Sequence, residues 1–91
     1  MYVNMKYILD AANRDNYAVM AVNSVNMEMA RAVIEAAEEL HSPIIVQFGV
    51  GQMKKLAHPD QMVPMIKAMA EKATEPATLR LGFVSFFFPL D

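Results

Sequence analysis

The chain has 91 residues, of which 55% are hydrophobic and 20% charged, so it can form one small domain but not two. Eight Lys and Arg residues against ten Asp and Glu residues give a formal net charge of −2, which lacks the cationic surplus that binds nucleic-acid phosphates. No cysteine is present, which excludes disulfides and thiolate metal sites. No secretory signal or membrane span is visible at the start, so we expect a cytoplasmic protein without a membrane or nucleic-acid partner.

The first half of the chain is predicted to alternate between helix and strand. Residues 4–14 carry apolar side chains at helical spacing, with Asn4 as a candidate N-cap. The apolar run 17–22 does not alternate with polar residues, which predicts a strand that is buried on both faces and ends at Asn23. Helical spacing returns from Met27 to Leu40, with Asn26 as the candidate cap.

The second half repeats this alternation. The β-branched run 44–48 predicts a second buried strand, and residues 49–58 are expected to form a loop. Pro59 then begins another helical stretch, which ends before Pro76. The remaining residues, 77–90, form an apolar tail in which a third strand is plausible and in which 83–88 have an aggregation-prone composition.

Strands that alternate with helices through short connections predict parallel βαβ units, so the fold class is α/β. A parallel sheet is stable when both of its faces are covered, and two or three strands with their helices cannot readily do this alone. We therefore interpret the chain as the opening part of a larger α/β architecture.

The candidate binding site follows from this class, because α/β proteins bind ligands at the carboxyl ends of their strands. The carboxamide of Asn23 can both donate and accept hydrogen bonds, and Gly49 allows a ligand to approach the backbone. The alternative is that an asparagine only caps the following helix and the glycines only form a turn. The residues that follow the two strands are Asn23, Ser24, Asn26, Gly49, Val50 and Gly51.

Other sites are disfavoured by spacing. The third glycine of a dinucleotide-binding fingerprint would fall at Lys54, and no Walker loop follows Gly49. Lys54 and Lys55 could attract a phosphate, although a solvated lysine pair in a loop is the favoured interpretation. The two histidines, His41 and His58, have no partners at metal-ligand intervals. No catalytic residue and no metal ligand is assigned from the sequence.

Three stretches resemble the N-terminal region of class II fructose-bisphosphate aldolases: residues 17–23, 26–28 and 34–47. The resemblance begins at Val3 and runs to about Pro76. Aldolases for tagatose bisphosphate and related sugars share this opening, so it does not fix the sugar. We therefore divide the chain into a barrel portion, residues 1–76, and a divergent apolar tail, residues 77–91.

The resemblance implies the N-terminal part of a TIM (β/α)8 barrel, with two to three βα units. It also implies a homo-oligomeric, zinc-dependent enzyme of carbohydrate metabolism and glycolysis, which cleaves a ketose 1,6-bisphosphate into dihydroxyacetone phosphate and an aldehyde. In that family zinc polarises the carbonyl and an aspartate handles the C4 hydroxyl proton. Asn23 matches a substrate-contacting asparagine, and Gly49 matches a position that often holds a phosphate-contacting serine.

The chain departs from the family near its third strand, where family members carry a His-Leu-Asp-His-Gly type motif. That motif holds the catalytic aspartate and a zinc-binding histidine, whereas this chain has Arg80, Leu81, Gly82 and Phe83. The resemblance places the other zinc ligands beyond Asp91. We therefore expect an aldolase-family fragment that is inactive alone, as a frameshifted or truncated product would be.

Two alternatives remain open. The chain could be a small non-catalytic interaction module that docks on protein partners through its methionine-rich helices and its phenylalanine-rich tail. It could also bind phosphorylated ligands without catalysis, through Asn23, Gly49, Gly51 and Lys54.

Overall fold

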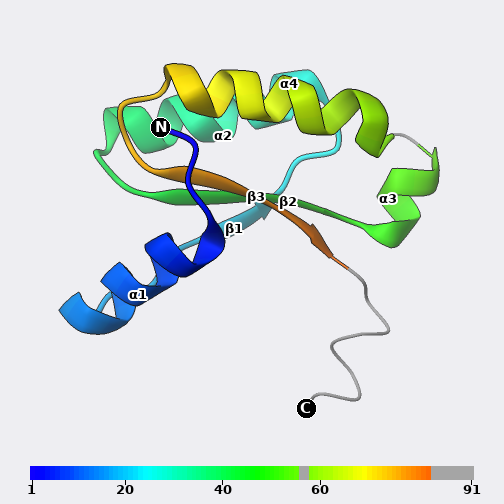
Figure 1. Ribbon diagram of the computed structural model, residues 1–91. Coiled ribbons are helices and arrows are strands. Elements are labelled where there is room, and N and C mark those ends of the chain that lie inside the picture. Colours follow the sequence, from blue (N-terminus) through cyan, green and yellow to red (C-terminus); the bar gives the residue numbers. More distant parts are fainter. Residues whose placement is uncertain (56–57, 83–91) are drawn as a thin grey trace, which may run out of the picture.

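The structure is a computed structural model that describes residues 1–55 and 58–82. This part of the chain forms a three-stranded parallel sheet flanked by helices, with strand order β1-β2-β3 (Figure 1). No helix in the described ranges is long and apolar enough to cross a membrane. The aggregation-prone segment 83–88 lies outside the described residues. The elements are α1 (Met5–Asp15), β1 (Ala21–Asn23), α2 (Met27–Glu39), β2 (Ile44–Gly49), α3 (Val50–Lys55), α4 (Pro59–Lys72) and β3 (Ala77–Gly82).

Side-chain caps start the first two helices where the sequence predicts them. The Asn4 side-chain oxygen accepts a hydrogen bond from the Tyr7 amide at 2.8 Å, and that of Asn26 accepts one from the Met29 amide at 2.8 Å. Each bond satisfies an amide that has no partner within its helix, so the two asparagines fix where α1 and α2 begin.

The end of α2 turns the chain toward β2. His41 has a left-handed backbone conformation, with φ of 53°. In this conformation the Ser42 amide donates to the Ala37 carbonyl at 2.9 Å, and the His41 amide donates to the Glu38 carbonyl at 3.2 Å. These two bonds satisfy carbonyls at the helix end and form a Schellman motif.

The three strands run parallel, as the βαβ pattern predicts. The central strand β2 pairs with β1 from Ala21–Ile45 to Asn23–Gln47. On its other side it pairs with β3 from Ile44–Ala77 to Gly49–Gly82. All three carboxyl ends therefore lie at one edge of the sheet, where α3 follows β2 (Figure 1).

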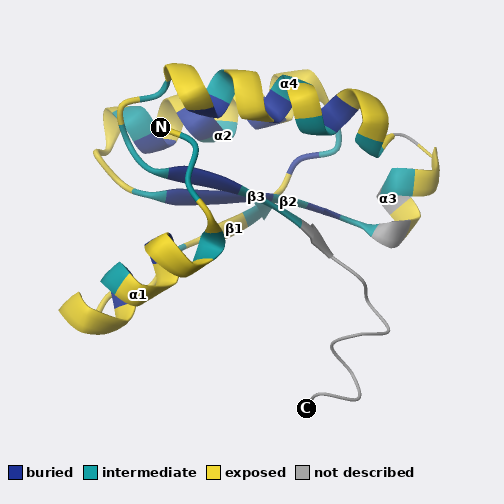
Figure 2. Ribbon diagram, in the orientation of Figure 1, coloured by how far each residue is buried: buried dark blue, intermediate teal, exposed yellow. Residues whose placement is uncertain are grey.

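One face of the sheet carries most of the core. Helices α2 and α4 lie side by side across this face, whereas α1 packs against β3 on the other side (Figures 1 and 2). Alternate side chains of a strand point to opposite faces, so Val46 and Phe48 both meet α2 and α4. The central buried cluster consists of Ala30, Ile34, Val46, Phe48, Met62 and Ile66.

The first strand is shorter and more exposed than predicted. The sequence predicts a fully buried strand over residues 17–22, but β1 spans Ala21–Asn23, and both of its end residues are exposed. Tyr17 and Met20 precede it and are also exposed. The reason is that β1 pairs on one side with β2 and forms an edge of the described sheet, so its apolar residues lack the second neighbour that would bury them.

The segment after β2 also differs from the prediction. Residues 50–55, expected as part of a loop, form the short helix α3. No glycine of the described chain has a positive φ, and nothing lies within 4 Å of a Cβ built on Gly51. Gly51 therefore marks neither a strained turn nor a close backbone approach. A six-residue helix is too short to show a clear apolar period, which explains the wrong prediction.

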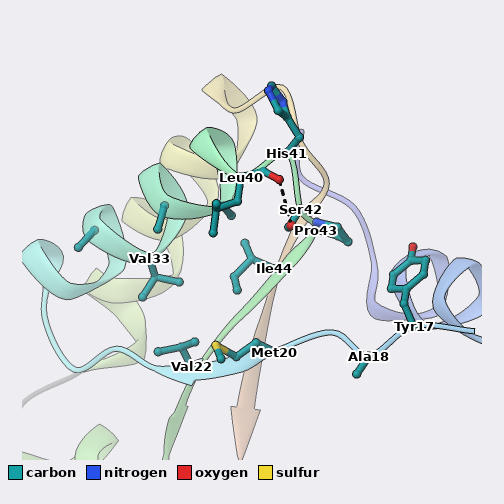
Figure 3. A pocket seen from close by; sticks show the side chains of 13 residues that line it. Tyr17, Ala18, Met20, Val22, Val33, Leu40, His41, Ser42, Pro43 and Ile44 are labelled. Atoms are coloured by element: carbon teal, nitrogen blue, oxygen red, sulfur yellow. Dashed lines mark hydrogen bonds between the residues drawn. The ribbon is translucent and has the colours of Figure 1, made fainter.

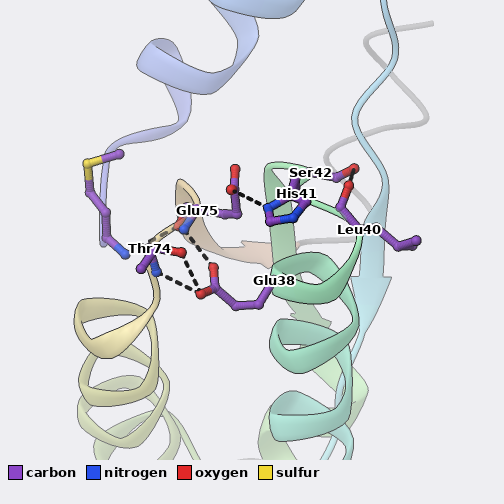
Figure 4. A network of polar contacts seen from close by, with 7 residues as sticks. Glu38, Leu40, His41, Ser42, Thr74 and Glu75 are labelled. Atoms are coloured by element: carbon purple, nitrogen blue, oxygen red, sulfur yellow. Dashed lines mark hydrogen bonds and ion pairs between the residues drawn. The ribbon is translucent and has the colours of Figure 1, made fainter.

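A carboxylate clamp joins α2 to the turn that leads into β3 (Figure 4). The Glu38 carboxylate accepts hydrogen bonds from the Thr74 amide at 2.9 Å, the Thr74 hydroxyl at 2.8 Å and the Glu75 amide at 2.6 Å. Nearby, Nδ1 of His41 lies 3.4 Å from Oε2 of Glu75. The clamp fixes the position of the turn and therefore the point at which β3 enters the sheet.

We expect Glu38→Gln to reduce the acid sensitivity of folding. The backbone amides of Thr74 and Glu75, with the Thr74 hydroxyl, lower the pKa of Glu38. A pKa lowered by folding contributes stability above the ordinary glutamate value, and this contribution is lost as pH falls through the folded pKa. Urea midpoints measured from about pH 7 to about pH 3 should therefore fall less steeply for the variant than for the wild type.

The matched control for this experiment is Glu39→Gln, which removes the same charge from the exposed neighbouring residue. We expect this control to keep the wild-type pH dependence. Equal slopes for Glu38→Gln and the wild type would contradict a role of the clamp in acid unfolding.

Candidate substrate-binding site

The carboxyl-terminal edge of the sheet brings the two predicted binding residues together. Asn23 ends β1 and lies opposite Gln47 on β2. Gly49 lies two residues beyond Gln47, so it belongs to the same face and ends β2 at the same edge. The interpretation of Asn23 and Gly49 as neighbours in one site therefore agrees with the strand register.

The register also places two further residues, Gln47 and Arg80, in this site. Gln47 pairs with Asn23 on one side and with Arg80 on the other, so these residues form a polar row across β1, β2 and β3. Val46 and Phe48 face α2 and α4, so the polar row lies on the opposite face of the sheet, the α1 face. Within the row, Nη1 of Arg80 donates to Oε1 of Gln47 at 2.9 Å.

On the α1 face, the polar row lies next to a layer of buried side chains that is one step closer to the amino ends of the strands. Ile45 and Thr78, two residues before Gln47 and Arg80, are 4% and 3% exposed. By contrast, Asn23 is exposed, and Gln47 and Arg80 are half-buried. The polar side chains are therefore accessible to solvent at the carboxyl edge, whereas Ile45 and Thr78 are buried.

The remaining candidates from the sequence have structural roles or lie apart from the row. Asn26 caps α2, as the simpler interpretation proposed. Ser24 is fully buried; its amide donates to the Gln47 carbonyl at 2.8 Å and its hydroxyl to the Val22 carbonyl at 3.3 Å. Lys54 and Lys55 are exposed at the end of α3.

Sequence reasoning missed Gln47 and Arg80 as site residues. Each is the only residue of its strand with a long polar or charged side chain, and this was the available signal. Their partnership depends on the register between β2 and β3, which the sequence does not reveal.

The described residues do not provide a metal centre. No group of three or more His, Asp or Glu side chains in the described ranges could hold a metal ion. His41 precedes β2 and His58 precedes α4, so the two histidines lie at opposite ends of the sheet. The side chains of the polar row are amides and a guanidinium, which are poor ligands for zinc. The zinc implied by the family resemblance therefore does not fit the residues described.

An apolar groove of about 840 Å³ lies elsewhere, between α2 and the chain segment that enters β1 (Figure 3). It opens on the α2 side of β1, away from the polar row. Its rim includes Leu40, which is 72% exposed, and Met20, which is 69% exposed. The groove is lined by Tyr17, Ala18, Met20, Val22, Ala32, Val33, Ala36, Ala37, Leu40, His41, Ser42, Pro43 and Ile44.

Barrel geometry explains this groove without a ligand. In a closed (β/α)8 barrel, the first strand pairs on both sides and the helix after it packs against the last helix. The unpaired side of β1 and the adjacent face of α2 would then be covered by the last βα unit. The groove therefore marks an open flank of the sheet, and the candidate site remains the polar row.

The parallel sheet in the order β1-β2-β3, with α2 and α4 on one face, has the arrangement of the first βα units of a TIM barrel. The family model for class II fructose-bisphosphate aldolases matches residues 3–82. The chain therefore belongs to the class II fructose-bisphosphate aldolase family. The match continues past Pro76 to the end of β3, so the third strand lies within the family region.

Known proteins similar to this chain agree with this assignment. The fructose-bisphosphate aldolase of Mycoplasma pneumoniae is 39% identical over 88 residues, which are 94% of this chain and 31% of that protein. The fructose-bisphosphate aldolase of Thermus caldophilus is 37% identical over 96% of this chain and 28% of its own length. The crystal structure of the YdjI aldolase from Escherichia coli K12 superposes with a TM-score of 0.80 at 36% identity, over 89% of this chain and 30% of that one. The chain thus spans less than a third of each.

Proposed function

We propose that this chain carries the opening part of an aldolase substrate site and binds the phosphorylated end of a ketose bisphosphate or a triose phosphate. The observation that carries this proposal is the position of Asn23 and Gly49 beside Gln47 at the carboxyl edge of a parallel sheet. Membership of the fructose-bisphosphate aldolase family supports a sugar phosphate as the ligand class.

The chemistry of these residues suits a sugar phosphate. The Asn23 and Gln47 amides each offer a donor and an acceptor, so they can bond hydroxyl groups in either direction. Gly49 has no side chain, which allows a ligand to approach the backbone at the end of β2 closely. In the family resemblance a serine often stands at the position of Gly49, so this contact would come from the backbone here.

We infer that the chain does not cleave ketose bisphosphates by itself. Where the resemblance implies a His-Leu-Asp-His-Gly type motif, this chain has Arg80, Leu81, Gly82 and Phe83. None of these side chains can act as a zinc ligand or as a proton acceptor, so both chemical groups of the motif are absent. The assignment to glycolysis and to a homo-oligomeric assembly rests on the family resemblance, whereas the cytoplasmic location rests on the sequence features given above.

The first test is a titration of the ¹⁵N-labelled chain with dihydroxyacetone phosphate, followed by NMR. We expect saturable shifts of amides at the ends of β1 and β2. Asn23→Ala should weaken binding about fivefold, because it removes one neutral hydrogen bond. Asn13→Ala, which changes an exposed asparagine of α1, should leave the affinity unchanged.

The same preparation tests catalysis. With fructose 1,6-bisphosphate and added zinc, we expect no release of triose phosphate above the rate without protein. Equal affinities of Asn23→Ala and the wild type would show that the ligand does not contact Asn23. Zinc-dependent cleavage would contradict the inferred inactivity.

A further inference from the structure

We propose that two copies of this chain pair through the open flank of the sheet and form a symmetric dimer. The flank consists of the outer edge of β1 and the apolar groove beside it. The proposal goes beyond the proposed function, because a sugar phosphate would contact side chains on the α1 face. The flank instead involves the backbone of β1 and the side of the sheet that α2 covers.

The first observation is the direction of the backbone groups in β1. The Ser24 amide donates to the Gln47 carbonyl at 2.8 Å, so the backbone of Ser24 points toward β2. Backbone groups of successive residues point to opposite sides of a strand, so those of Ala21 and Asn23 point away from β2. Both residues are exposed, and within the described ranges no strand pairs with this side of β1. Such an edge is a template for pairing with another strand.

The second observation is an apolar stripe on α2 beside this edge. The stripe consists of four residues at helical spacing, of which three are exposed and Val33 is half-buried: Met29, Ala32, Val33 and Ala36. Val33 lies across the groove from Val22 of β1 (Figure 3). A continuous apolar surface next to an unpaired strand edge is typical of an interaction site.

A second copy of the chain fits this flank because the flank is self-complementary. In a closed barrel the last βα unit would bring one strand and one helix to this position. The flank of a second copy offers the same two elements, its own β1 edge and its own apolar stripe. A two-fold axis perpendicular to the sheet brings each element of one copy against the same element of the other. Rotation about this axis does not exchange the faces of the sheet, so both α2 helices stay on one face.

The register of the dimer follows from the directions of the backbone groups. With the axis at Val22, Ala21 of one copy lies opposite Asn23 of the other, and the two residues exchange both backbone hydrogen bonds. The symmetry repeats this pair on the other side of the axis. The two Val22 side chains then meet on the α2 face, beneath the paired apolar stripes. The two sheets become one continuous sheet with an antiparallel centre.

Charges beside the stripe give the dimer a specific salt dependence. Glu28, Glu35 and Glu39 are exposed and border the stripe on α2, so the two copies bring like charges toward each other. Salt shortens the range of such repulsion from about 8 Å at about 0.15 M to about 3 Å at about 1 M. We therefore expect a tighter dimer at the higher salt concentration. Weaker association at about 1 M would show that ion pairs rather than the apolar stripe hold the copies, and would overturn the proposal.

The test is sedimentation velocity of the full chain at both salt concentrations, over a series of protein concentrations. We expect a reversible equilibrium between the 10.2 kDa monomer and a species of twice that mass. Ala36→Glu places a charge in the stripe but keeps a strong helix former, so it should weaken dimerisation at least about tenfold. The matched control is Ala68→Glu, the same change at an exposed position of α4, which should dimerise like the wild type.

Ala21→Pro tests the strand pairing separately. Proline removes the outward amide of Ala21, but it is accepted in an edge strand where that amide faces solvent. We expect the variant to keep the wild-type circular dichroism spectrum and to lose the dimer. In the wild type, hydrogen exchange of the Asn23 amide should slow as the protein concentration rises, because pairing with the second copy protects it.

Several results would contradict the dimer. A wild-type chain that stays monomeric at about 1 mM would overturn it. Equal dissociation constants for Ala36→Glu and Ala68→Glu would place any association elsewhere, for example in the residues beyond Gly82. If Ala21→Pro does not fold, an Asn23 exchange rate that is independent of protein concentration overturns the strand pairing.

Discussion

A chain that ends at Pro76 is expected to lose cooperative unfolding, whereas one that ends at Gly82 is expected to keep it. The six residues between these ends are β3, which pairs with the whole of β2. Their removal leaves β2 with a single short partner, β1. Two-stranded sheets are marginally stable in water at best.

Strand β3 also holds the N-terminal segment. The Ala77 amide donates to the Met1 carbonyl at 2.9 Å, and the Val3 amide donates to the Ala77 carbonyl at 3.0 Å. The Met1 ammonium in turn donates to the Ala70 carbonyl at 2.5 Å, at the end of α4. Truncation at Pro76 therefore releases the segment that precedes α1 as well as the third strand.

Urea unfolding followed by far-ultraviolet circular dichroism measures this difference. The chain 1–82 is the matched control, because it keeps every strand pairing described above. We expect a sigmoidal transition for 1–82 and a broad, nearly linear change for 1–76. Equal midpoints and slopes would show that the βα units before Pro76 fold without the third strand.

Phe48→Ala is expected to cost about 3–5 kcal/mol of unfolding free energy. Phe48 is fully buried and packs in the central cluster with residues of α2 and α4. Alanine leaves a cavity there, because the main chain of the central strand is fixed by hydrogen bonds on both sides and cannot collapse into the space. A domain of this size has a net stability near the lower end of about 5–15 kcal/mol, so much of the variant should be unfolded.

Two control variants separate the cavity from other effects. Phe48→Leu keeps most of the volume and should cost less than about 2 kcal/mol. Leu40→Ala removes a side chain that is 72% exposed and should change stability by less than about 0.5 kcal/mol. The urea midpoint reports the stability of all three variants. A midpoint of Phe48→Ala close to that of Leu40→Ala would contradict the central position of Phe48 in the core.

The location of the candidate site was predictable because it depends on chain order. Any residue that follows a strand of a parallel sheet lies at the same edge, so Asn23 and Gly49 could be placed together without knowing the register. Arg80 and Gln47 could not, because their contact depends on which residues of β2 and β3 lie opposite each other. The sequence also suggested a division at Pro76, whereas the family match extends through β3. Beyond Gly82 that division stays a prediction.

Local chemistry in the sequence by itself determined where the elements lie: asparagine caps begin α1 and α2, and β-branched residues after Pro43 form β2. Only the tertiary structure decided how far each strand pairs, because β1 is limited by having one neighbour and not by its own apolar run. It also decided that Glu38 clamps the turn before β3 and that Gln47 orients Arg80. The physical reason is that caps and periodicity act within a few residues, whereas strand pairing and the polar contacts of Glu38 and Arg80 join residues more than twenty positions apart.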